Sequence, residues 1–337
     1  MLQVDNRTPF PAVLSVFPAP SGVETAYAAL KITYDLTSGR PVPSPRQAGF
    51  LAADVYWGDP TSSSLRAAGD VTLLKPTTDI MLIGRAISIS GPVGVMDVTL
   101  QVGPVIETLR VSGERFWTRD GKSWRPTDPK AFDRMPLRWE LAYGGTTPPN
   151  PDQPMEVEAR NPVGRGFIGS WETDFEGRPL PCIESPECRI TTPQDRPAPV
   201  GYAPVAPVWQ FRSRHAGTYD EAWQKTRAPH LPFDFNPLFL HAAPPALISP
   251  SRLEGGEDVV LRGVAATPLA FALPEPDVEL EFDFAGANIA SKPLLDTVLF
   301  EPDTGRMQMV WRAELAVDKR LLKLRTLRVA YDKALHP

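Results

Sequence analysis

Apolar and polar residues alternate with a period of two in several parts of the chain. In residues 278–284 (VELEFDF) apolar and acidic residues alternate without exception. Residues 96–102 (MDVTLQV) follow the same rhythm, and residues 137–143 and 307–312 follow it in part. A period of two is typical of a strand that has one face in the core and the other in solvent. We therefore predict strands in all four segments.

Other patterns favour the same fold class. Residues 80–83 (IMLI) are apolar without alternation, which favours a central strand that is covered on both faces. Glycine pairs such as Gly144-Gly145 and Gly255-Gly256 provide turns, and helical periodicity over more than two turns is scarce. We predict a mainly β fold of packed antiparallel, sandwich-like sheets with few short helices.

Proline and tryptophan distinguish the middle of the chain from its flanks. Of the 39 prolines, 22 lie in residues 126–250, and six of the eight tryptophans lie in residues 117–223. Proline cannot continue a helix or a central strand, but a disordered linker would hold few large aromatic residues. We expect residues 1–337 to form a single β-rich unit. Its sub-regions are residues 1–125 (β-rich), 126–250 (Pro/Trp-rich and irregular, with one short helix) and 251–337 (β-rich).

One short helix has a recognisable start. Residues 218–221 (TYDE) fit a capping box with Thr218 as the N-cap and a glutamate at the third helical position. Pro229 ends the segment, which leaves about nine helical residues. Tyr219 and Trp223 are four residues apart, so they share one face of this helix. The two rings either anchor the helix to the core or form an exposed aromatic patch that binds a partner.

Charge and composition argue against several classes of protein. The formal net charge is −5, whereas nucleic-acid-binding proteins have basic surfaces. No stretch approaches the ~18 apolar residues of a membrane span, and the first residues do not resemble a signal peptide. Cys182 and Cys188 are too few for a disulfide scaffold and lack the spacing of a zinc site. We expect a cytoplasmic protein with no nucleic-acid or membrane partner, no metal and no cofactor.

Motifs that would indicate catalysis are weak. Residues 164–169 (GRGFIG) match the dinucleotide-binding pattern, but no strand precedes them and no helix follows, so we expect a turn-rich loop. Glu140 and Glu172 each follow a tryptophan, as in a glycosidase cleft, where two carboxyl groups stand roughly 5–10 Å apart. Because the sequence does not place these two residues so close, a glycosidase is only an alternative hypothesis.

Three acids of the 278–284 segment share one strand face: Glu279, Glu281 and Asp283. Residues 319–328 carry five positive charges and no acid. If the two segments are neighbouring antiparallel strands, cations such as Lys323 and Arg325 face these acids. The alternatives are a solvated edge strand and an acidic patch that faces a partner.

Several motifs in a fixed order resemble those of a known bacterial family. They are residues 31–36 (KITYDL), 70–84 (DVTLLKPTTDIMLIG), 135–145 (MPLRWELAYGG), 161–166 (NPVGRG), 216–223 (AGTYDEAW), and 295–298 (LDTV) with 311–313 (WRA). Over about residues 5–315 they resemble the domain-of-unknown-function 2169 family, which is associated with type VI secretion.

The resemblance implies a non-enzymatic adaptor or chaperone. Such a protein binds a type VI secretion effector that carries a PAAR-like domain and assists its loading onto the secretion spike; the spike protein is a further candidate partner. The family provides no catalytic residues. Two alternatives stay open, a carbohydrate-active enzyme with an aromatic cleft and a purely structural component of the secretion apparatus.

Protein interfaces combine aromatic and apolar surface with a polar rim. On that basis we select candidate partner-binding residues on the short helix and at the end of the strand predicted for residues 137–143. They are Tyr219, Trp223, Trp139, Tyr143, Gly144 and Gly145.

Overall fold

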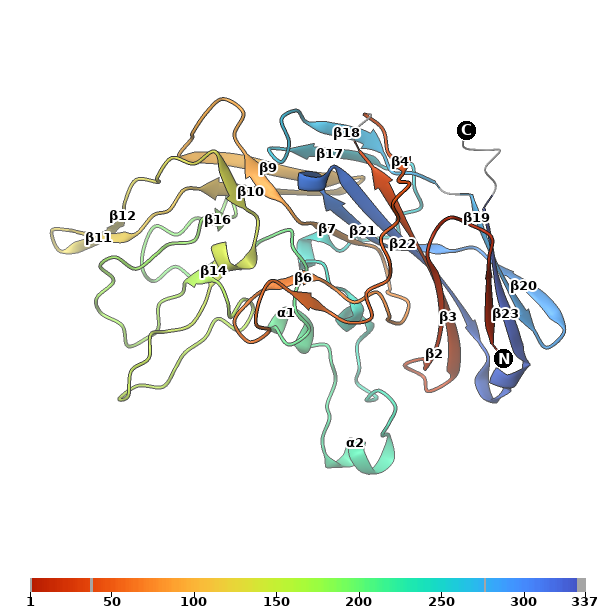
Figure 1. Cartoon of the computed structure of the whole chain (residues 1–337). Coiled ribbons are helices and arrows are strands. Elements are labelled where there is room, and N and C mark those ends of the chain that lie inside the picture. Colours follow the sequence, from red (N-terminus) through yellow and green to blue (C-terminus); the bar gives the residue numbers. More distant parts are fainter. Residues whose placement is uncertain (1, 37–38, 276, 332–337) are drawn as a thin grey trace.

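A computed structural model describes residues 2–36, 39–275 and 277–331 of the protein (Figure 1). Strands dominate it and the helices are short, so the prediction of a mainly β fold is confirmed. Within the described residues, the strands form three larger sheets, which are mostly antiparallel, and four pairs of short strands.

The largest sheet combines strands from the beginning and the end of the chain. Its order is β2 (Ala12–Pro18), β3 (Glu24–Asp35), β22 (Arg306–Ala316), β21 (Leu294–Glu301) and β7 (Asp79–Leu82), and β4 (Val42–Pro43) also pairs with β3. Neighbouring strands run antiparallel, except that β7 is parallel to β21.

Strand β3 is buried along almost its whole length because both of its faces are covered. Leu30 and Ile32 belong to the main hydrophobic core. The residues that alternate with them, Lys31 and Thr33, instead bind the segment 47–70 that crosses the opposite face. The sheet therefore carries polar groups on a face that solvent does not reach.

The second sheet also combines the two ends of the described chain. Its order is β1 (Gln3–Asn6), β23 (Leu324–Tyr331), β19 (Val278–Phe284) and β20 (Ala287–Ser291). β1 is parallel to β23, and the other pairs are antiparallel. In β19 the apolar residues are buried and the acids are not, as the alternation predicts.

The prediction that the acidic and basic segments are neighbouring antiparallel strands is confirmed, but the partners proposed for the acids are wrong. Glu281 lies opposite Arg328 and forms an ion pair with it. A register shift after Asp283 leaves Arg325 without a partner position on β19, and Lys323 lies in a 3-10 helix before the strand. Before the bulge, the register places the even-numbered residues of β23 opposite the acids of β19, and the charge pattern alone does not indicate this register.

The third sheet has the order β16 (Ile183–Glu184), β10 (Val105–Ser112), β9 (Val95–Val102), β17 (Asp258–Arg262) and β18 (Leu269–Ala272). The short pairs are β5 (Val55–Tyr56) with β6 (Leu65–Ala67), β8 (Arg85–Ile87) with β13 (Arg134–Pro136), β11 (Trp117–Asp120) with β12 (Ser123–Pro126), and β14 (Tyr143–Gly144) with β15 (Arg165–Gly166). The helices are α1 (Gln210–Ser213) and α2 (Glu221–Thr226), with 3-10 helices η1 (Trp139–Leu141), η2 (Pro237–Leu240), η3 (Pro245–Leu247), η4 (Pro302–Thr304) and η5 (Asp318–Lys323).

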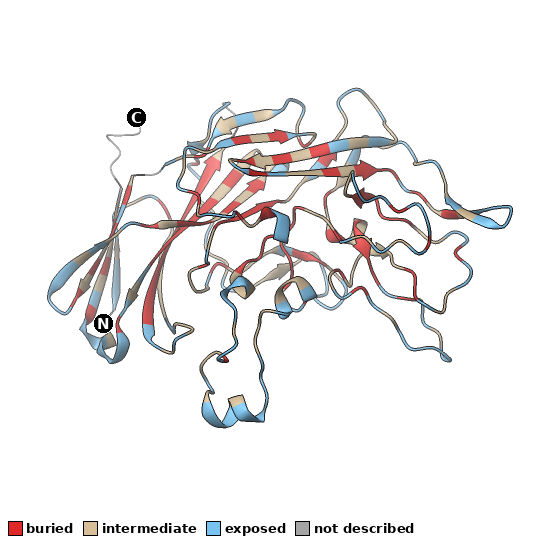
Figure 2. Cartoon of the chain, turned by 180° about the vertical axis from the view of Figure 1, so that it is seen from behind, coloured by how far each residue is buried: buried red, intermediate tan, exposed pale blue. Residues whose placement is uncertain are grey.

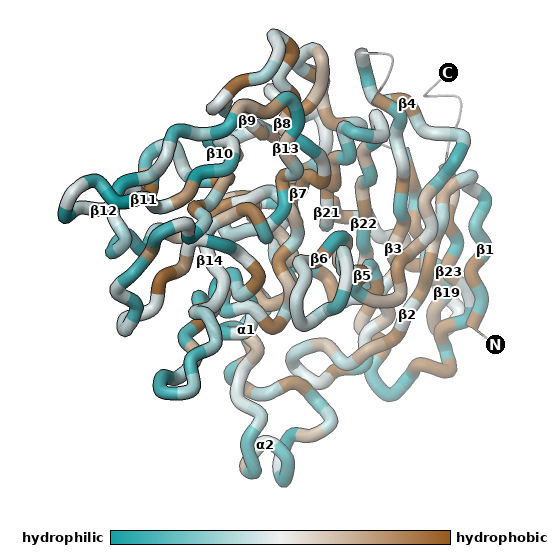
Figure 3. Tube along the Cα trace, turned by 60° about the vertical axis from the view of Figure 1, so that its left-hand side comes forward, coloured by the Kyte–Doolittle hydropathy of each residue, from teal (hydrophilic) through white to brown (hydrophobic). Residues whose placement is uncertain are grey.

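Buried residues are frequent in the strands of the large sheets (Figure 2), and hydrophobic residues recur along β3, β21 and β22 (Figure 3). The main core includes Leu30 from β3, Phe282 from β19 and, from the Pro/Trp-rich region, Trp139, Tyr202 and Leu247. A second, smaller cluster includes Trp117 and Phe175 and lies wholly within residues 117–190. All three sub-regions thus contribute to the main core.

Strands form at residues 96–102, 278–284 and 307–312 as predicted, but the strand prediction for residues 137–143 is wrong. There the backbone forms the 3-10 turn η1 and only then the two-residue strand β14. The side-chain amide of Asn161 donates to the carbonyls of Trp139 and Tyr143, both at 2.9 Å. These bonds hold the chain in a compact turn, in which alternating residues still reach the core.

Strand β7 is buried at every residue, as the pattern of residues 80–83 indicates, but its predicted central position is wrong. It is the last strand of its sheet, and irregular segments of the Pro/Trp-rich region cover its outer edge. The amide of Leu82 donates to the carbonyl of Tyr202 at 3.0 Å, and Asp79 forms a single bridge with Ile248. Covered irregular chain thus takes the place of a further strand.

Candidate functional site

The most prominent projection of the molecule is the segment around α2, which we call the arm (residues 216–235) (Figure 1). It leaves the body after α1 and returns before η2, and the amide of Asn236 donates to the carbonyl of His215 at its base. Helix α2 lies at its far end and is largely exposed (Figure 2).

The helix begins later than the sequence predicts. Asp220, and not Thr218, is the N-cap, and its carboxylate accepts a hydrogen bond from the amide of Trp223 at 2.8 Å. Thr218 instead donates through its amide and hydroxyl to the carboxylate of Asp234, at 3.0 and 2.7 Å. These bonds hold the pKa of Asp234 below its usual value. The two hydrogen bonds between Thr218 and Asp234 join the outgoing and returning segments of the arm near its base.

Tyr219 and Trp223 belong to the arm and do not anchor α2 to the core. Their rings meet edge to face with centroids 4.7 Å apart, and the indole of Trp223 donates to the carbonyl of His230 at 2.9 Å. Tyr219 is 53% exposed and Phe233 is 83% exposed, while Trp223 is half-buried. The arm therefore presents two aromatic side chains to solvent on a scaffold that Trp223 organises.

Arg227 gives the arm a fixed contact with the body. Its guanidinium donates to the carbonyl of Leu231 within the arm and to the carbonyl of Pro20 in the β2–β3 turn, at 2.8 and 2.7 Å. The same guanidinium lies 4.5 Å from the ring centroid of Phe233. The arm is therefore attached to the sheet at a second point besides its base.

The other four candidate partner-binding residues lie in the interior, so the proposal of a surface at residues 139–145 needs correction. Trp139 and Tyr143 are each 1% exposed, and Gly144 and Gly145 are buried. The indole of Trp139 donates to two backbone carbonyls, and its ring packs edge to face on Trp209. In this structure these four residues stabilise the fold, and their burial makes them unavailable to a partner.

Gly144 is required by a close approach of two backbone segments. Its φ is +147°, and a Cβ atom at this position would lie 2.1 Å from the carbonyl oxygen of Asn161. It pairs with Gly166 of β15, so the motifs at residues 135–145 and 161–166 pack against each other. Both motifs are explained by this contact.

The carboxylates considered for a glycosidase hold loops in place. Glu140 accepts hydrogen bonds from the amide and hydroxyl of Ser64, at 2.7 and 2.8 Å. Glu172 accepts from the amide of Gly169 at 2.8 Å and forms an ion pair with Arg178. Neither carboxylate lines the two cavities described below.

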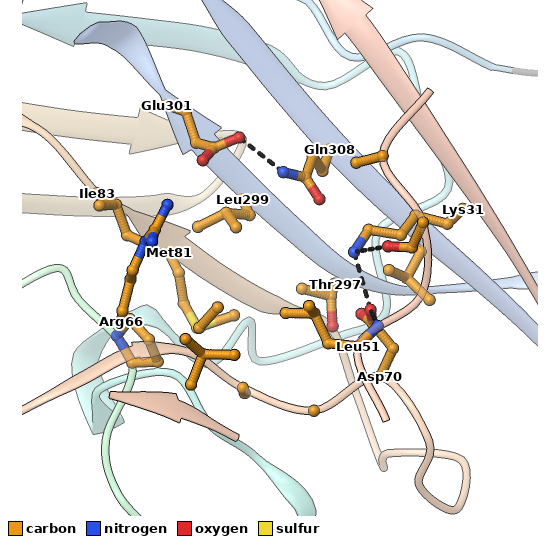
Figure 4. Close-up of a pocket in the computed structure, with 18 of the residues that line it drawn as sticks. Lys31, Leu51, Arg66, Asp70, Met81, Ile83, Thr297, Leu299, Glu301 and Gln308 are labelled. Atoms are coloured by element: carbon orange, nitrogen blue, oxygen red, sulfur yellow. Dashed lines mark hydrogen bonds and ion pairs between the residues drawn. The ribbon is translucent and has the colours of Figure 1, made fainter. Parts of the chain in front are cut away.

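A cavity of about 330 Å³, here called the sheet cavity, lies between the sheet β3–β22–β21–β7 and the covering segment 48–70 (Figure 4). The ammonium of Lys31 donates to the carboxylate of Asp70 at 2.8 Å, and Asp70 also accepts from the amide of Leu51 at 2.7 Å. Gln308 donates to the carboxylate of Glu301 across the cavity wall at 2.6 Å. Lys31, Asp70 and Glu301 are thus already paired with neighbouring groups, whereas the guanidinium of Arg66 lies 5.4 Å from the ring centroid of Trp57.

Behind the sheet cavity lies a network of fully buried charges. The ammonium of Lys75 lies 2.8 Å from the carboxylate of Asp79 and 3.2 Å from that of Asp296, which is also 3.2 Å from Arg312. Burial alone would raise the pKa of Asp79, but Lys75 and the hydrogen bond from His241 outweigh it and hold that pKa far below its usual value. The carboxylates in turn raise the pKa of Lys75 against the effect of its burial.

Our sequence analysis did not identify this network, although a signal was present. All members of the network except His241 lie in the motifs at residues 70–84, 295–298 and 311–313. The nearby pair Lys31–Asp70 also lies in such motifs, at residues 31–36 and 70–84. Charged residues inside otherwise apolar strands indicate buried pairing. The network therefore accounts for several of the motifs that the arm and the glycine turns leave unexplained.

In the part of the chain that the structure describes, no group of three or more His, Cys, Asp or Glu side chains could hold a metal ion. Cys182 is buried, which raises the pKa of its thiol, and Cys188 is exposed. No helix among the described residues is both long enough and apolar enough to cross a membrane.

Comparison with known proteins gives a match to one family. The family model described as "Uncharacterized protein conserved in bacteria (DUF2169)" matches residues 21–312. No curated protein and no solved structure matches the chain.

Proposed function

Because the chain belongs to the DUF2169 family of bacterial proteins, we propose that it is a non-enzymatic adaptor or chaperone of type VI secretion. It binds an effector that carries a PAAR-like domain, in the cytoplasm, and assists the loading of this effector onto the secretion spike. The proposal rests on the resemblance of the motifs and on one structural feature, the arm.

The observation that supports partner binding best is the exposed aromatic surface of the arm. Tyr219 and Phe233 expose more than half of their surface, and both belong to the arm, which projects from the body. Exposed aromatic residues beside charged ones are typical of the centres of protein interfaces. Protein interfaces also have a polar rim, and charged side chains of the arm can provide one here. They are Arg227, Glu221 and Lys225.

The arm is also held in a defined shape before any partner binds. The Thr218–Asp234 bonds, the Trp223–His230 bond and the contact of Arg227 with Pro20 fix it internally and against the sheet. A surface that is ordered in advance loses less conformational entropy on binding. An adaptor that must form a stable complex with an effector benefits from this property.

The experiment is co-expression of the chain with a PAAR-like effector of the same bacterium, followed by size-exclusion chromatography and calorimetry. We expect a stoichiometric complex. Tyr219→Ala and Phe233→Ala should each weaken it by more than tenfold, as for the strongest residues of an interface. Leu322→Ala removes a side chain that is 98% exposed on η5 and is the matched control, with unchanged affinity.

Two results would contradict the proposal. The chain fails as an adaptor if no complex forms with any PAAR-like effector of that bacterium. If the only assembly is a complex of the chain with itself, the purely structural role is correct instead. Equal melting temperatures of the variants and the wild type would ensure that lost affinity reports the surface and not unfolding.

A further inference from the structure

A second cavity, of about 400 Å³, lies where the arm joins the body, and we call it the root cavity. Its walls come from α1 and η2 on either side of the arm, from the segment 243–250 and from Pro76 and Thr77. A chain bound along the arm would therefore reach this cavity.

The polar lining of the root cavity consists mainly of two arginines and two histidines, and Arg214 donates to Nε2 of His215 at 3.1 Å. Arg212, Arg214, His215 and His241 all contribute to it, and its lining within the described residues contains no Asp or Glu. Its other walls are largely apolar, with Phe211 and Ile248 among them. Such a lining favours a ligand that carries a negative charge on a small apolar body.

Two buried polar atoms of the lining have no hydrogen-bond partner among the residues that the structure describes. His241 is 1% exposed, and its Nδ1 lies 2.7 Å from the ionised carboxylate of Asp79, so Nδ1 carries the hydrogen and Nε2 is left over. The hydroxyl of Ser249, which is also 1% exposed, is unpartnered as well. Nε2 of His241 can accept a hydrogen bond and the hydroxyl of Ser249 can donate one, so the cavity offers a ligand both kinds of partner.

Arg212 provides a half-buried positive charge at the same place. Its guanidinium donates to the carbonyls of Phe239 and Val205, at 3.2 and 2.9 Å, and within the described residues it forms no ion pair with a carboxylate. Burial lowers the pKa of this guanidinium, which means that its charge is poorly solvated. A carboxylate bound beside it would offset this cost, and arginine is well suited to bind one.

We propose that the root cavity binds the carboxylate of an acidic segment of the partner that the arm holds. This inference rests on the proposed function. The carboxylate lies between the guanidinium groups of Arg212 and Arg214 and accepts a hydrogen bond from the hydroxyl of Ser249, while a backbone N–H of the same segment donates to Nε2 of His241. The volume and the apolar walls fit an aspartate or glutamate side chain with its neighbours, whereas a bare phosphate would leave the apolar walls uncovered.

The test uses the full chain with small probes. The imidazole signals of the ¹⁵N-histidine-labelled protein are followed by NMR during titration with N-acetyl-aspartate, N-acetyl-asparagine and inorganic phosphate. We expect a saturable shift of the His241 signals with N-acetyl-aspartate and none with the uncharged amide. Arg214→Gln, at the rim of the cavity, should weaken binding about five- to tenfold, since it removes one charged contact. Arg325→Gln, an exposed arginine on β23, is the matched control and should bind as the wild type does.

Several results would overturn the inference. They are equal binding of the aspartate and asparagine probes, no saturable shift at all, or tighter binding of phosphate than of N-acetyl-aspartate. Ser249→Ala removes an atom that has no hydrogen-bond partner among the described residues, so this variant should fold normally and bind the probe several-fold more weakly.

The effector complex separates this inference from the proposed function. If Arg214→Gln leaves the affinity for the effector unchanged while Tyr219→Ala abolishes it, the adaptor role stands and the role of the root cavity fails. If no effector binds but N-acetyl-aspartate still does, the cavity binds carboxylates and the adaptor role fails. If Arg214→Gln binds both N-acetyl-aspartate and the effector more weakly than the wild type does, the result supports the two proposals together.

Discussion

At the scale of single residues, Asp79 connects the largest sheet to the Pro/Trp-rich region. One carboxylate oxygen accepts from the amide of Ala242 at 2.8 Å, and the other meets His241. The same carboxylate pairs with Lys75, which precedes β7. Removal of one partner from a buried ion pair leaves an uncompensated charge, which is costly.

We predict that Asp79→Asn lowers the free energy of unfolding at pH 7 by about 3–5 kcal/mol. The folded-state pKa of Asp79 lies below the usual value of 3.8. The stability that Asp79 contributes is therefore complete above that value and is lost as the pH falls from it toward the folded-state pKa. Thermal unfolding between pH 7 and pH 3 should show a smaller acid-induced loss in the variant than in the wild type.

The exposed Asp258 provides the control for this comparison. Asp258→Asn should change the unfolding midpoint little and keep the wild-type dependence on pH. Parallel acid profiles for Asp79→Asn and the wild type would show that the carboxylate does not contribute in this way.

A second prediction concerns the register between β19 and β23. Glu281→Lys should destabilise the protein by about 1 kcal/mol, because it places two cations opposite each other. Arg328→Glu should recover part of that loss when it is added, although Arg328 also lies 3.7 Å from Asp5. Chemical denaturation of the single and double variants measures the coupling.

Arg325→Glu added to Glu281→Lys is the matched control, because Arg325 has no partner position on β19. It should recover nothing. Equal recovery by the two double variants would mean that the register is not the one described here.

At the scale of the elements, the cap of α2 decides whether this six-residue helix persists. Asp220→Ala removes the acceptor of the Trp223 amide and should cost about 1 kcal/mol of local stability. Hydrogen exchange at the Trp223 amide should become about fivefold faster. Asp220→Ser keeps an acceptor and should exchange nearly as the wild type does. Equal rates in all three proteins would contradict the assignment of the cap.

The contact between the two glycine-containing motifs gives a further prediction. Gly144→Ala should prevent correct folding, since its Cβ would overlap the carbonyl of Asn161 and Gly144 has a positive φ. Gly49→Ala is the control, because nothing lies within 4 Å of the corresponding position. Circular dichroism and soluble yield compare the two variants. A folded Gly144→Ala protein would show that β14 and β15 can move apart.

The sequence predicts strands well where one face is buried and the other is solvated, as in β9 and β19. It fails at residues 137–143, because the hydrogen bonds from Asn161 are made by a side chain eighteen or more positions away. It also misplaces the N-cap of α2, since Thr218 and Asp220, two positions apart, can each serve and the tertiary partner Asp234 selects between them. Long-range polar contacts, which no local pattern encodes, are the common cause.

At the scale of the whole molecule, we predict that the Pro/Trp-rich region does not separate as an independent domain. Trp139, Tyr202 and Leu247 share the main core with residues of β3 and β19. Limited proteolysis should therefore release no stable fragment of residues 126–250. Isolation of such a fragment, folded and soluble, would contradict the prediction. Cleavage within the exposed arm, detected by mass spectrometry, is the expected early event.

The candidate partner-binding surface and the cavities are the features that the sequence predicts least well. Tyr219 and Trp223 were selected because of their helical spacing, and the structure places them on the projecting arm. Trp139 and Tyr143 were selected because they are aromatic, but aromatic residues occupy cores as readily as interfaces. Neither cavity was predicted, because each combines segments that are far apart in the sequence.

The pairing of early strands with late ones has a consequence for synthesis on the ribosome. β3 pairs with β22, and β1 pairs with β23, so nearly the whole chain must be made before either sheet can close. At 5–20 residues per second, the apolar strand β3 waits roughly fifteen to sixty seconds for its partner. During that time its unpaired edge could join other chains. The nascent protein is thus expected to depend on a holding chaperone such as those at the ribosomal exit.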